Sequence, residues 1–168
     1  MEQKIIGYHG TSEKAALNII KTRQFKKSDK KNEWLGKGVY FYELLEKAQW
    51  WCQKKSNPTI IEANILVSSE KLLNLDNTPE LDQLARFIKE MNESDHQFVF
   101  SEDKTERRCQ LLNIYMEYYG YHVIIGTFVS TNKKYKKELN EIGYTRTEKQ
   151  ICVHNTDCIV YNELKVIC

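Results

Sequence analysis

The sequence lacks the two kinds of segment that would direct a chain to a membrane. No apolar run is long enough to span a bilayer, and no apolar run of signal-peptide length follows the first four residues. The five cysteines, at positions 52, 109, 152, 158 and 168, include no C-x-x-C pair. An odd cysteine count without metal-ligand spacing is typical of free thiols in a reducing compartment. We therefore expect a cytoplasmic protein with no membrane partner.

Several familiar catalytic motifs are missing as well. The sequence contains no G-x-x-x-x-G-K-[ST] phosphate-binding loop and no nucleophile elbow. Its four histidines include no pair at the i, i+4 spacing that places two metal ligands on one helix face. We therefore predict no metal site, and we expect His154, near the end of an apolar strand, to bond a backbone group.

The composition indicates one folded domain over residues 1–168. Hydrophobic residues make up 41% of the chain and charged residues 29%, which is typical of a globular protein with a full core. We find no internal repeat, low-complexity tract or linker. The net charge is only +2, so any attraction to an anionic partner must come from local clusters of basic residues.

Hydrophobic periodicity predicts strands at the start, middle and end of the chain with helices between them, an α+β class. Thr78 and Pro79 are expected to open a helix whose buried face includes Leu81 and Leu84. Gly120 is expected to end the next helix. The expected helices cover about residues 12–21, 43–54, 79–91 and 105–119. The expected strands cover about residues 4–9, 39–42, 59–67, 72–75, 121–126, 148–154 and 162–167.

Two short segments place polar groups and bare backbone beside expected strands. His9-Gly10-Thr11 follows the first apolar strand, where an imidazole and unhindered backbone groups can face a ligand. Gly36-Lys37-Gly38 precedes an aromatic strand in which Tyr40 and Tyr42 share one face. Taken alone, each segment is better explained as an ordinary turn or a core strand than as a ligand site. A functional interpretation of these segments depends on the order in which they occur along the chain.

A third segment, residues 148–154, is a strand with polar groups on one side. Alternation places Glu148, Gln150 and Cys152 on the same face. In this order the three segments resemble the ADP-ribosyltransferase superfamily, in its poly(ADP-ribose)-polymerase-like, or diphtheria-toxin-like, branch. That branch carries a His in a first-strand H-G-T/S, a Tyr in G-x-G-x-Y-F, and a Glu opening a later strand.

The whole chain is similar to a small bacterial subgroup of that superfamily. Its members share the pattern Y-H-G-T-S … G-x-G-x-Y-F … A-x-x-W … Y-x-V-I-I-G … Q-I-x-F/V-H. Here Ala48, Trp51, residues 121–126 and residues 150–154 match the later parts of the pattern. The resemblance implies an ADP-ribosyltransferase-like split β-sandwich with inserted helices, which holds NAD in a cleft as substrate.

The resemblance also implies roles for individual residues. His9 would bond the ribose hydroxyl on the adenosine side, and Gly10, next to Thr11, would bond the nicotinamide amide through its backbone. Tyr40 would stack on the nicotinamide ring, and Gln150 falls where the family's catalytic Glu lies. The implied activity is mono-ADP-ribosylation of a macromolecular acceptor, protein or nucleic acid, with release of nicotinamide. Such a protein would be a bacterial toxin or defence effector with an antitoxin or immunity partner.

Gln150 is a departure from the family pattern. A neutral amide can hydrogen-bond the ribose, but it supplies no negative charge, and such electrostatic stabilisation is worth roughly 3–4 kcal/mol in other enzymes. Glu148 lies on the same strand face and could act in its place. Three alternatives remain open: an NAD- or nucleotide-binding module without catalysis, an RNA 2′-phosphotransferase, and a protein-interaction domain.

Two lysine clusters stand out in a nearly neutral chain. One lies in the loop before the Tyr40 strand, and the other lies before the Gln150 strand. If the two meet at the cleft, they predict an anionic acceptor, whereas two solvated loops are the simpler interpretation. The clusters are Lys26, Lys27, Lys30 and Lys31, and Lys133, Lys134, Lys136 and Lys137.

Overall fold

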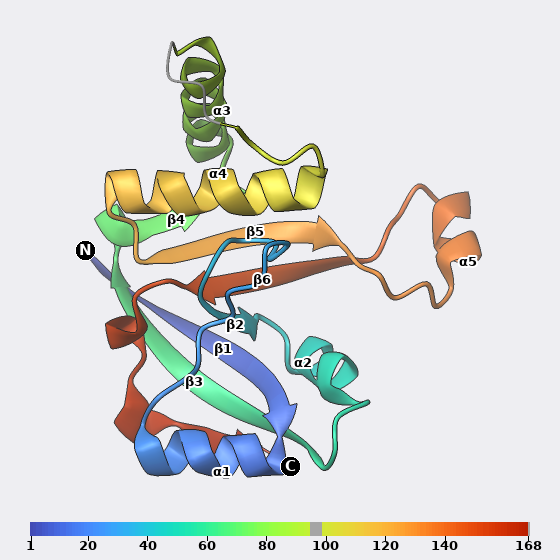
Figure 1. Ribbon diagram of the computed structural model, residues 1–168. Helices are drawn as coiled ribbons and strands as arrows, with labels where there is room; N and C mark the ends of the chain where they lie inside the picture. Colours follow the sequence, from blue (N-terminus) through green and yellow to red (C-terminus); the bar gives the residue numbers. More distant parts are fainter. Residues whose placement is uncertain (95–98, 168) are drawn as a thin grey trace.

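The computed structural model describes residues 1–94 and 99–167, which form a mixed α and β fold around one seven-stranded sheet (Figure 1). The strand order is β4-β5-β6-β2-β1-β3-β7, and every neighbouring pair is antiparallel except β4 and β5. The expected mixture of strands and helices is therefore confirmed. The strands are β1 (Glu2–Ser12), β2 (Val39–Tyr42), β3 (Pro58–Ser68), β4 (Leu72–Asn74), β5 (Val123–Val129), β6 (Thr147–Val153) and β7 (Lys165–Ile167).

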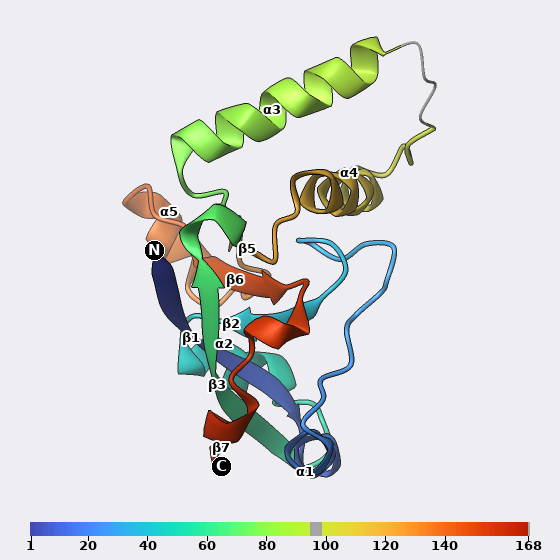
Figure 2. The same cartoon turned by 90° about the vertical axis from the view of Figure 1, so that its left-hand side faces the viewer.

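The helices lie at opposite ends of the sheet. Figures 1 and 2 show α4 lying over β4 and β5, with α3 beyond it. α1 and α2 lie near the C-terminal end of β1 and the N-terminal end of β3. None of the helices in residues 1–94 and 99–167 is both long enough and apolar enough to cross a membrane. The helices are α1 (Glu13–Thr22), α2 (Leu45–Cys52), α3 (Thr78–Glu93), α4 (Lys104–Tyr119) and α5 (Lys136–Glu141).

Strand pairing within the sheet is shortest between β1 and β2. β1 pairs with β3 along its whole length, from Glu2 opposite Ser68 to Ser12 opposite Pro58. By contrast, β1 and β2 are in register only at Tyr8 opposite Tyr42, after which the two strands part. The sheet therefore consists of one half, β4-β5-β6-β2, and a second half, β1-β3-β7, joined over a short stretch.

Two apolar clusters fill opposite faces of this sheet. One lies between α4 and the β4–β6 half and includes Leu112, Tyr115 and Ile124. The other lies on the opposite face and includes Phe41 and Ile151. The predicted alternation in β2 and β6 is thus confirmed, because neighbouring residues enter different clusters. The described cysteines, at positions 52, 109, 152 and 158, are all buried and unbridged, as expected of free thiols.

The start of α1 and the end of α4 follow sequence signals, whereas the start of α3 is shifted by one residue. The Ser12 hydroxyl accepts a hydrogen bond from the Ala15 N–H at the start of α1, and Gly120 ends α4 in the left-handed region. The N-cap of α3 is Asn77, not the predicted Thr78, which is its first helical residue. Such shifts of one residue are common at helix ends.

The buried face of α3 differs from the predicted one. Leu84 is buried as expected, but Leu81 is 48% exposed and the unpredicted Phe87 is buried. The ring of Phe87 packs edge-on against that of Tyr115 in α4, with centroids 5.0 Å apart. The helix is thus rotated so that its aromatic residue, which buries the most area, faces α4.

Gly7 allows the core to close at the point where the two halves of the sheet join. A methyl group on Gly7 would lie 2.7 Å from Cβ of Phe41, a side chain with no solvent exposure. Real Cβ atoms do not approach so closely, and Phe41 is confined by the surrounding core.

We expect Gly7→Ala to lower the free energy of unfolding by about 1–3 kcal/mol, the usual cost of overpacking a core. Chemical denaturation would measure the loss, with the exposed strand substitution Lys4→Ala as the control. An unchanged or raised stability of Gly7→Ala would mean that the strand junction is looser than described, since alanine by itself stabilises the folded chain relative to glycine.

Candidate functional site

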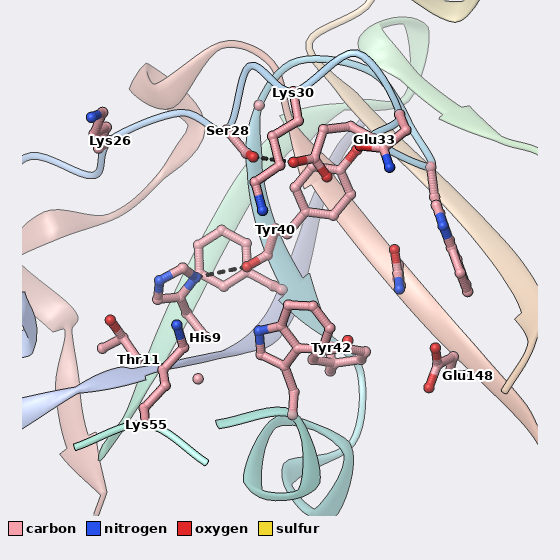
Figure 3. A pocket seen from close by; sticks show the side chains of 17 residues that line it. His9, Thr11, Lys26, Ser28, Lys30, Glu33, Tyr40, Tyr42, Lys55 and Glu148 are labelled. Atoms are coloured by element: carbon pink, nitrogen blue, oxygen red, sulfur yellow. Dashed lines mark hydrogen bonds between the residues drawn. The ribbon is translucent and has the colours of Figure 1, made fainter. Parts of the chain in front are cut away.

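A cleft of about 370 Å³ opens where β1 and β2 part (Figure 3). Its walls come from β1, the loop before β2, β2 itself, α2 and β6. All six residues singled out in the sequence line this one cleft: His9, Gly10, Thr11, Tyr40, Glu148 and Gln150. Three segments that are far apart in the chain thus supply one site.

His9 bridges the two diverging strands through its side chain. Its Nδ1 lies 2.8 Å from the Tyr40 carbonyl oxygen. Because a carbonyl only accepts, Nδ1 carries the proton, and Nε2 of the neutral ring is an acceptor. Burial, and to a lesser extent the charge of Lys55, lower the pKa of His9, while the bond to Tyr40 raises it. The imidazole is therefore neutral at neutral pH.

Gly10 and Thr11 form the edge of the cleft beside His9. Because β2 leaves β1 after Tyr8, the backbone of β1 at these residues faces the cleft on one side and β3 on the other. The glycine itself is required by α2, since a methyl group on Gly10 would lie 2.6 Å from the Ala48 carbonyl oxygen. The close approach expected at Gly10 is thus at least partly an approach to the protein's own helix.

Tyr40 is held rigidly in the wall of the cleft. Its hydroxyl donates to the Gly36 carbonyl oxygen at 2.6 Å and accepts from the Leu35 N–H at 2.9 Å. Burial, and next the neighbouring Cys152, raise the pKa of Tyr40, so its hydroxyl stays protonated. The ring is fixed from both ends, by the strand and by the loop that its hydroxyl secures.

Glu148 and Gln150 lie on β6 at the other end of the cleft, and both are buried, with exposed fractions of 4% and 8%. The Ser130 hydroxyl donates to Oε2 of Glu148 at 3.2 Å. Burial raises the pKa of Glu148, while Ser130 and the charge of Lys47 lower it. Gln150 stands between Tyr42 of β2 and Gly126 of β5 in the sheet.

Charge is distributed unevenly around the cleft. Lys26, Lys30 and Lys55 line it together with the carboxylate of Glu33, which accepts a hydrogen bond from Ser28. Figure 3 shows Lys30 and Lys55 on the side of His9, whereas Glu148 lies on the opposite side beyond Tyr42. The cleft therefore offers cations at the His9 end and a buried acid at the β6 end.

Several cleft residues were not found by sequence reasoning. Helical spacing left either Trp51 or Cys52 for the apolar face of α2; Cys52 takes the buried position, whereas Trp51 is 56% exposed and lines the cleft. Lys55 and Glu33 were not singled out. The A-x-x-W match had marked Trp51, so the motif was a better guide to this residue than periodicity.

The two lysine clusters lie in different places. Lys26 and Lys30 line the cleft, whereas Lys133 and Lys136 line a smaller hollow of about 80 Å³ beside α5, together with Arg146. Ser130 connects the two regions, because it borders this hollow and bonds Glu148. The clusters are thus not on one shared rim, although the second hollow adjoins the acidic end of the cleft.

The remaining site predictions concern histidine and metals. Nε2 of His154 lies 2.9 Å from the Leu35 carbonyl oxygen, so the predicted backbone bond of His154 is confirmed. Within residues 1–94 and 99–167, no group of three or more His, Cys, Asp or Glu side chains is arranged to hold a metal ion.

Comparisons with known proteins add little to this description. No family model matches the chain. Over 76 aligned residues the chain is 34% identical to a protein of Methanocaldococcus jannaschii described as uncharacterized, and the aligned part covers 40% of this chain and 36% of the relative. The chain thus matches only about a third of that protein's length, and the likeness assigns no activity.

The lowered pKa values of His9 and His154 predict that the protein loses stability in mild acid. Below about pH 6.5 the unfolded chain binds protons at these positions and the folded chain does not, so the free energy of unfolding falls as the pH falls. Each histidine can contribute a slope of up to about 1.4 kcal/mol per pH unit. We expect His9→Gln to show a weaker loss than wild type between pH 7 and pH 5 in denaturant titrations.

The raised pKa of Glu148 acts in the opposite direction, since the folded chain then binds the extra proton. Glu148 is present in both wild type and His9→Gln, so its contribution cancels in the difference between their pH dependences. Lys31→Gln, on the same loop as the cleft lysines, is the control and should keep the full pH dependence. If His9→Gln kept it too, the imidazole would be charged in the folded protein.

Proposed function

We propose that this chain is a mono-ADP-ribosyltransferase that transfers ADP-ribose from NAD to a macromolecular acceptor and releases nicotinamide. The observation that carries the proposal is the meeting of His9, Tyr40 and Glu148 in one cleft. The proposal includes the ADP-ribosyltransferase-like split β-sandwich. The parting of β1 and β2 after a single residue pair, with the cleft between them, supports that more specific fold.

The size and charge of the cleft suit a dinucleotide. Its volume of about 370 Å³ falls within the range of roughly 300–1,000 Å³ for small-molecule sites. Lys26, Lys30 and Lys55 can form charge-assisted hydrogen bonds with a diphosphate. Nε2 of neutral His9 can accept a bond from a ribose hydroxyl on the adenosine side. This arrangement directs the nicotinamide riboside toward β6.

Aromatic groups at the β6 end can hold the nicotinamide ring. Tyr40 offers one ring held in place by its hydroxyl bonds, and the exposed ring of Trp51 offers a second surface. Stacking on aromatic side chains is a common way to bind planar heterocycles. The backbone edge of β1 at Gly10 is available to bond the carboxamide group.

In the proposed reaction, the bond between ribose C1′ and the nicotinamide nitrogen breaks, and its electron pair leaves with nicotinamide. Positive charge develops on the ribose, and an acceptor nucleophile then bonds to C1′ and loses its proton. Developing positive charge favours the ionised form of Glu148, which can stabilise it. Gln150 can hold a ribose hydroxyl in position through its amide.

The surroundings of Glu148 support an anionic acceptor. The hollow beside α5 adjoins this end of the cleft through Ser130, and its charged lining residues are Lys133, Lys136 and Arg146. An acidic protein surface or a nucleic-acid strand would be attracted to this region. NAD and the acceptor would then approach the ribose from different sides of β6.

A second candidate function is an NAD-binding module without turnover. The observation that favours it is Gln150 itself, which places a neutral amide where the related enzymes carry a carboxylate. Under this candidate the cleft binds NAD in the same orientation, and the bond to nicotinamide stays intact. The two functions therefore differ in catalysis and share the binding site.

We expect wild-type protein to bind NAD in calorimetry and to release nicotinamide, measured by chromatography. Lys26→Ala with Lys30→Ala should weaken NAD binding by about tenfold or more, because two charge-assisted bonds are lost. His9→Ala should also weaken it.

The matched control is Lys27→Ala with Lys31→Ala, which makes the same change of charge on the same loop outside the cleft. Its NAD affinity should stay close to that of wild type. An equal loss of NAD affinity in both double variants would mean that the lysines act only through a general electrostatic effect. A wild-type protein that binds no NAD would contradict both candidate functions.

Substitutions on β6 separate catalysis from binding. Glu148→Gln should lower nicotinamide release by about 10²–10³-fold while leaving NAD affinity nearly unchanged, because the charge acts mainly in the transition state. Gln150→Glu should keep or raise the rate, and Gln150→Ala should lower it. Single-turnover assays at saturating NAD would give these rates.

Two results would change the assignment on β6. Normal turnover by Glu148→Gln would remove Glu148 from the mechanism. The second result is that wild type binds NAD tightly without releasing nicotinamide, and that only Gln150→Glu releases it. This result would establish the binding module as the native function.

A further inference from the structure

A second large hollow lies between α3, α4 and β5. It is on the face of the sheet opposite to α1. It has a volume of about 540 Å³, and most of its lining atoms belong to apolar side chains. Figure 2 shows α3 crossing beyond α4. Leu81, Leu84 and Ile88 of α3 line it at the spacing of one helix face, and Leu81 is 48% exposed. We call this hollow the α3–α4 groove.

The charged residues of the α3–α4 groove are mostly basic. Lys104, Arg107 and Arg108 line it from the first turns of α4, followed by Leu111. The one carboxylate in the lining, Asp76, already accepts hydrogen bonds from the backbone and the hydroxyl of Thr127. The groove therefore combines an apolar floor with a row of cations along one side.

Arg108 is the most unusual of these cations. Its guanidinium lies 5.0 Å from the ring centroid of Phe128 and 5.8 Å from that of Trp34. Its buried Nε has no hydrogen-bond partner among the described residues, and none of the carboxylates in those residues forms an ion pair with it. Burial lowers the pKa of Arg108. A partly desolvated cation without an anion is costly, and an added carboxylate would offset that cost.

The groove and the cleft share a wall. Trp34 lines the cleft, and its ring packs on Phe128 with centroids 4.8 Å apart. Phe128 and Arg108 line the groove. A molecule seated against Arg108 would therefore touch the side chains that support Trp34 from behind.

We propose that the α3–α4 groove is the docking site for an acidic amphipathic helix of a partner protein. The apolar stripe of that helix would cover Leu81, Leu84 and Ile88, and its carboxylates would pair with the basic residues of α4. In helix-in-groove recognition the bound helix supplies apolar anchors at i, i+3, i+4 and i+7, and these would lie against the apolar floor of the groove. The inference is independent of the function of the cleft.

The test uses a fluorescein-labelled synthetic peptide of about four helical turns, with leucine at i, i+3, i+4 and i+7 and glutamate at the flanking positions. Wild-type protein should bind it saturably in fluorescence anisotropy, and binding should weaken with salt. Lys104→Glu with Arg107→Glu should weaken binding by about tenfold or more. These side chains are exposed, so the variant should fold normally.

Two controls locate the binding. Arg86→Glu reverses one exposed charge of α3 outside the groove and should leave the affinity within about twofold of wild type. Peptide binding should also change the tryptophan emission of wild type, Trp50→Phe and Trp51→Phe. Trp34→Phe should lose that change, because only Trp34 contacts the groove wall.

Four results would overturn the proposal. The glutamate peptide does not bind, or a peptide with lysine in place of glutamate binds equally well. Arg86→Glu weakens binding as much as the double variant. Sedimentation velocity shows that the chain self-associates and that the double variant abolishes this, which would make a second copy the occupant of the groove.

Discussion

The site depends on one hydrogen bond, from Nδ1 of His9 to the Tyr40 carbonyl oxygen. It lies where two antiparallel strands stop pairing, and it joins the two halves of the sheet just beyond the last residue pair. The ladder is thus continued by a side chain in place of a backbone N–H, which keeps the strands close while a cleft opens between them. The same bond fixes the tautomer of His9, so the second ring nitrogen faces the cleft as an acceptor.

The pair Glu148 and Gln150 illustrates how burial limits the chemistry of one strand face. Both side chains are almost fully buried, and two carboxylates at these positions would each raise the other's pKa. With an amide at 150, the charge of Glu148 is opposed by burial but not by a second acid on the same strand face. An amide at position 150 therefore makes Glu148 easier to ionise than a second carboxylate there would, which is a physical reason to consider Glu148 as the acid of the proposed site.

Local patterns predicted the parts of the site that depend on strand alternation. The shared face of Glu148 and Gln150 followed from periodicity, whereas the meeting of three strand segments in one cleft was expected from the family resemblance alone. Periodicity did not decide between Trp51 and Cys52 in α2, and it placed Leu81 of α3 on the buried face, because the rotation of a helix about its axis also depends on distant partners. Periodicity could not predict the place of Lys55 in the cleft or the α3–α4 groove, because both depend on contacts between elements far apart in sequence.

The loop before β2 has little regular structure, yet it is tied down along its length. Phe25 is buried in the core, Ser28 and Gly38 exchange two backbone hydrogen bonds, Trp34 packs on Phe128, and Tyr40 secures the far end through its hydroxyl. Much of the backbone entropy of this segment is therefore given up when the chain folds, so a ligand would mainly restrict exposed side chains such as Lys26 and Lys30. The cleft is preorganised by its least regular segment, so affinity there depends on complementarity of charge and shape.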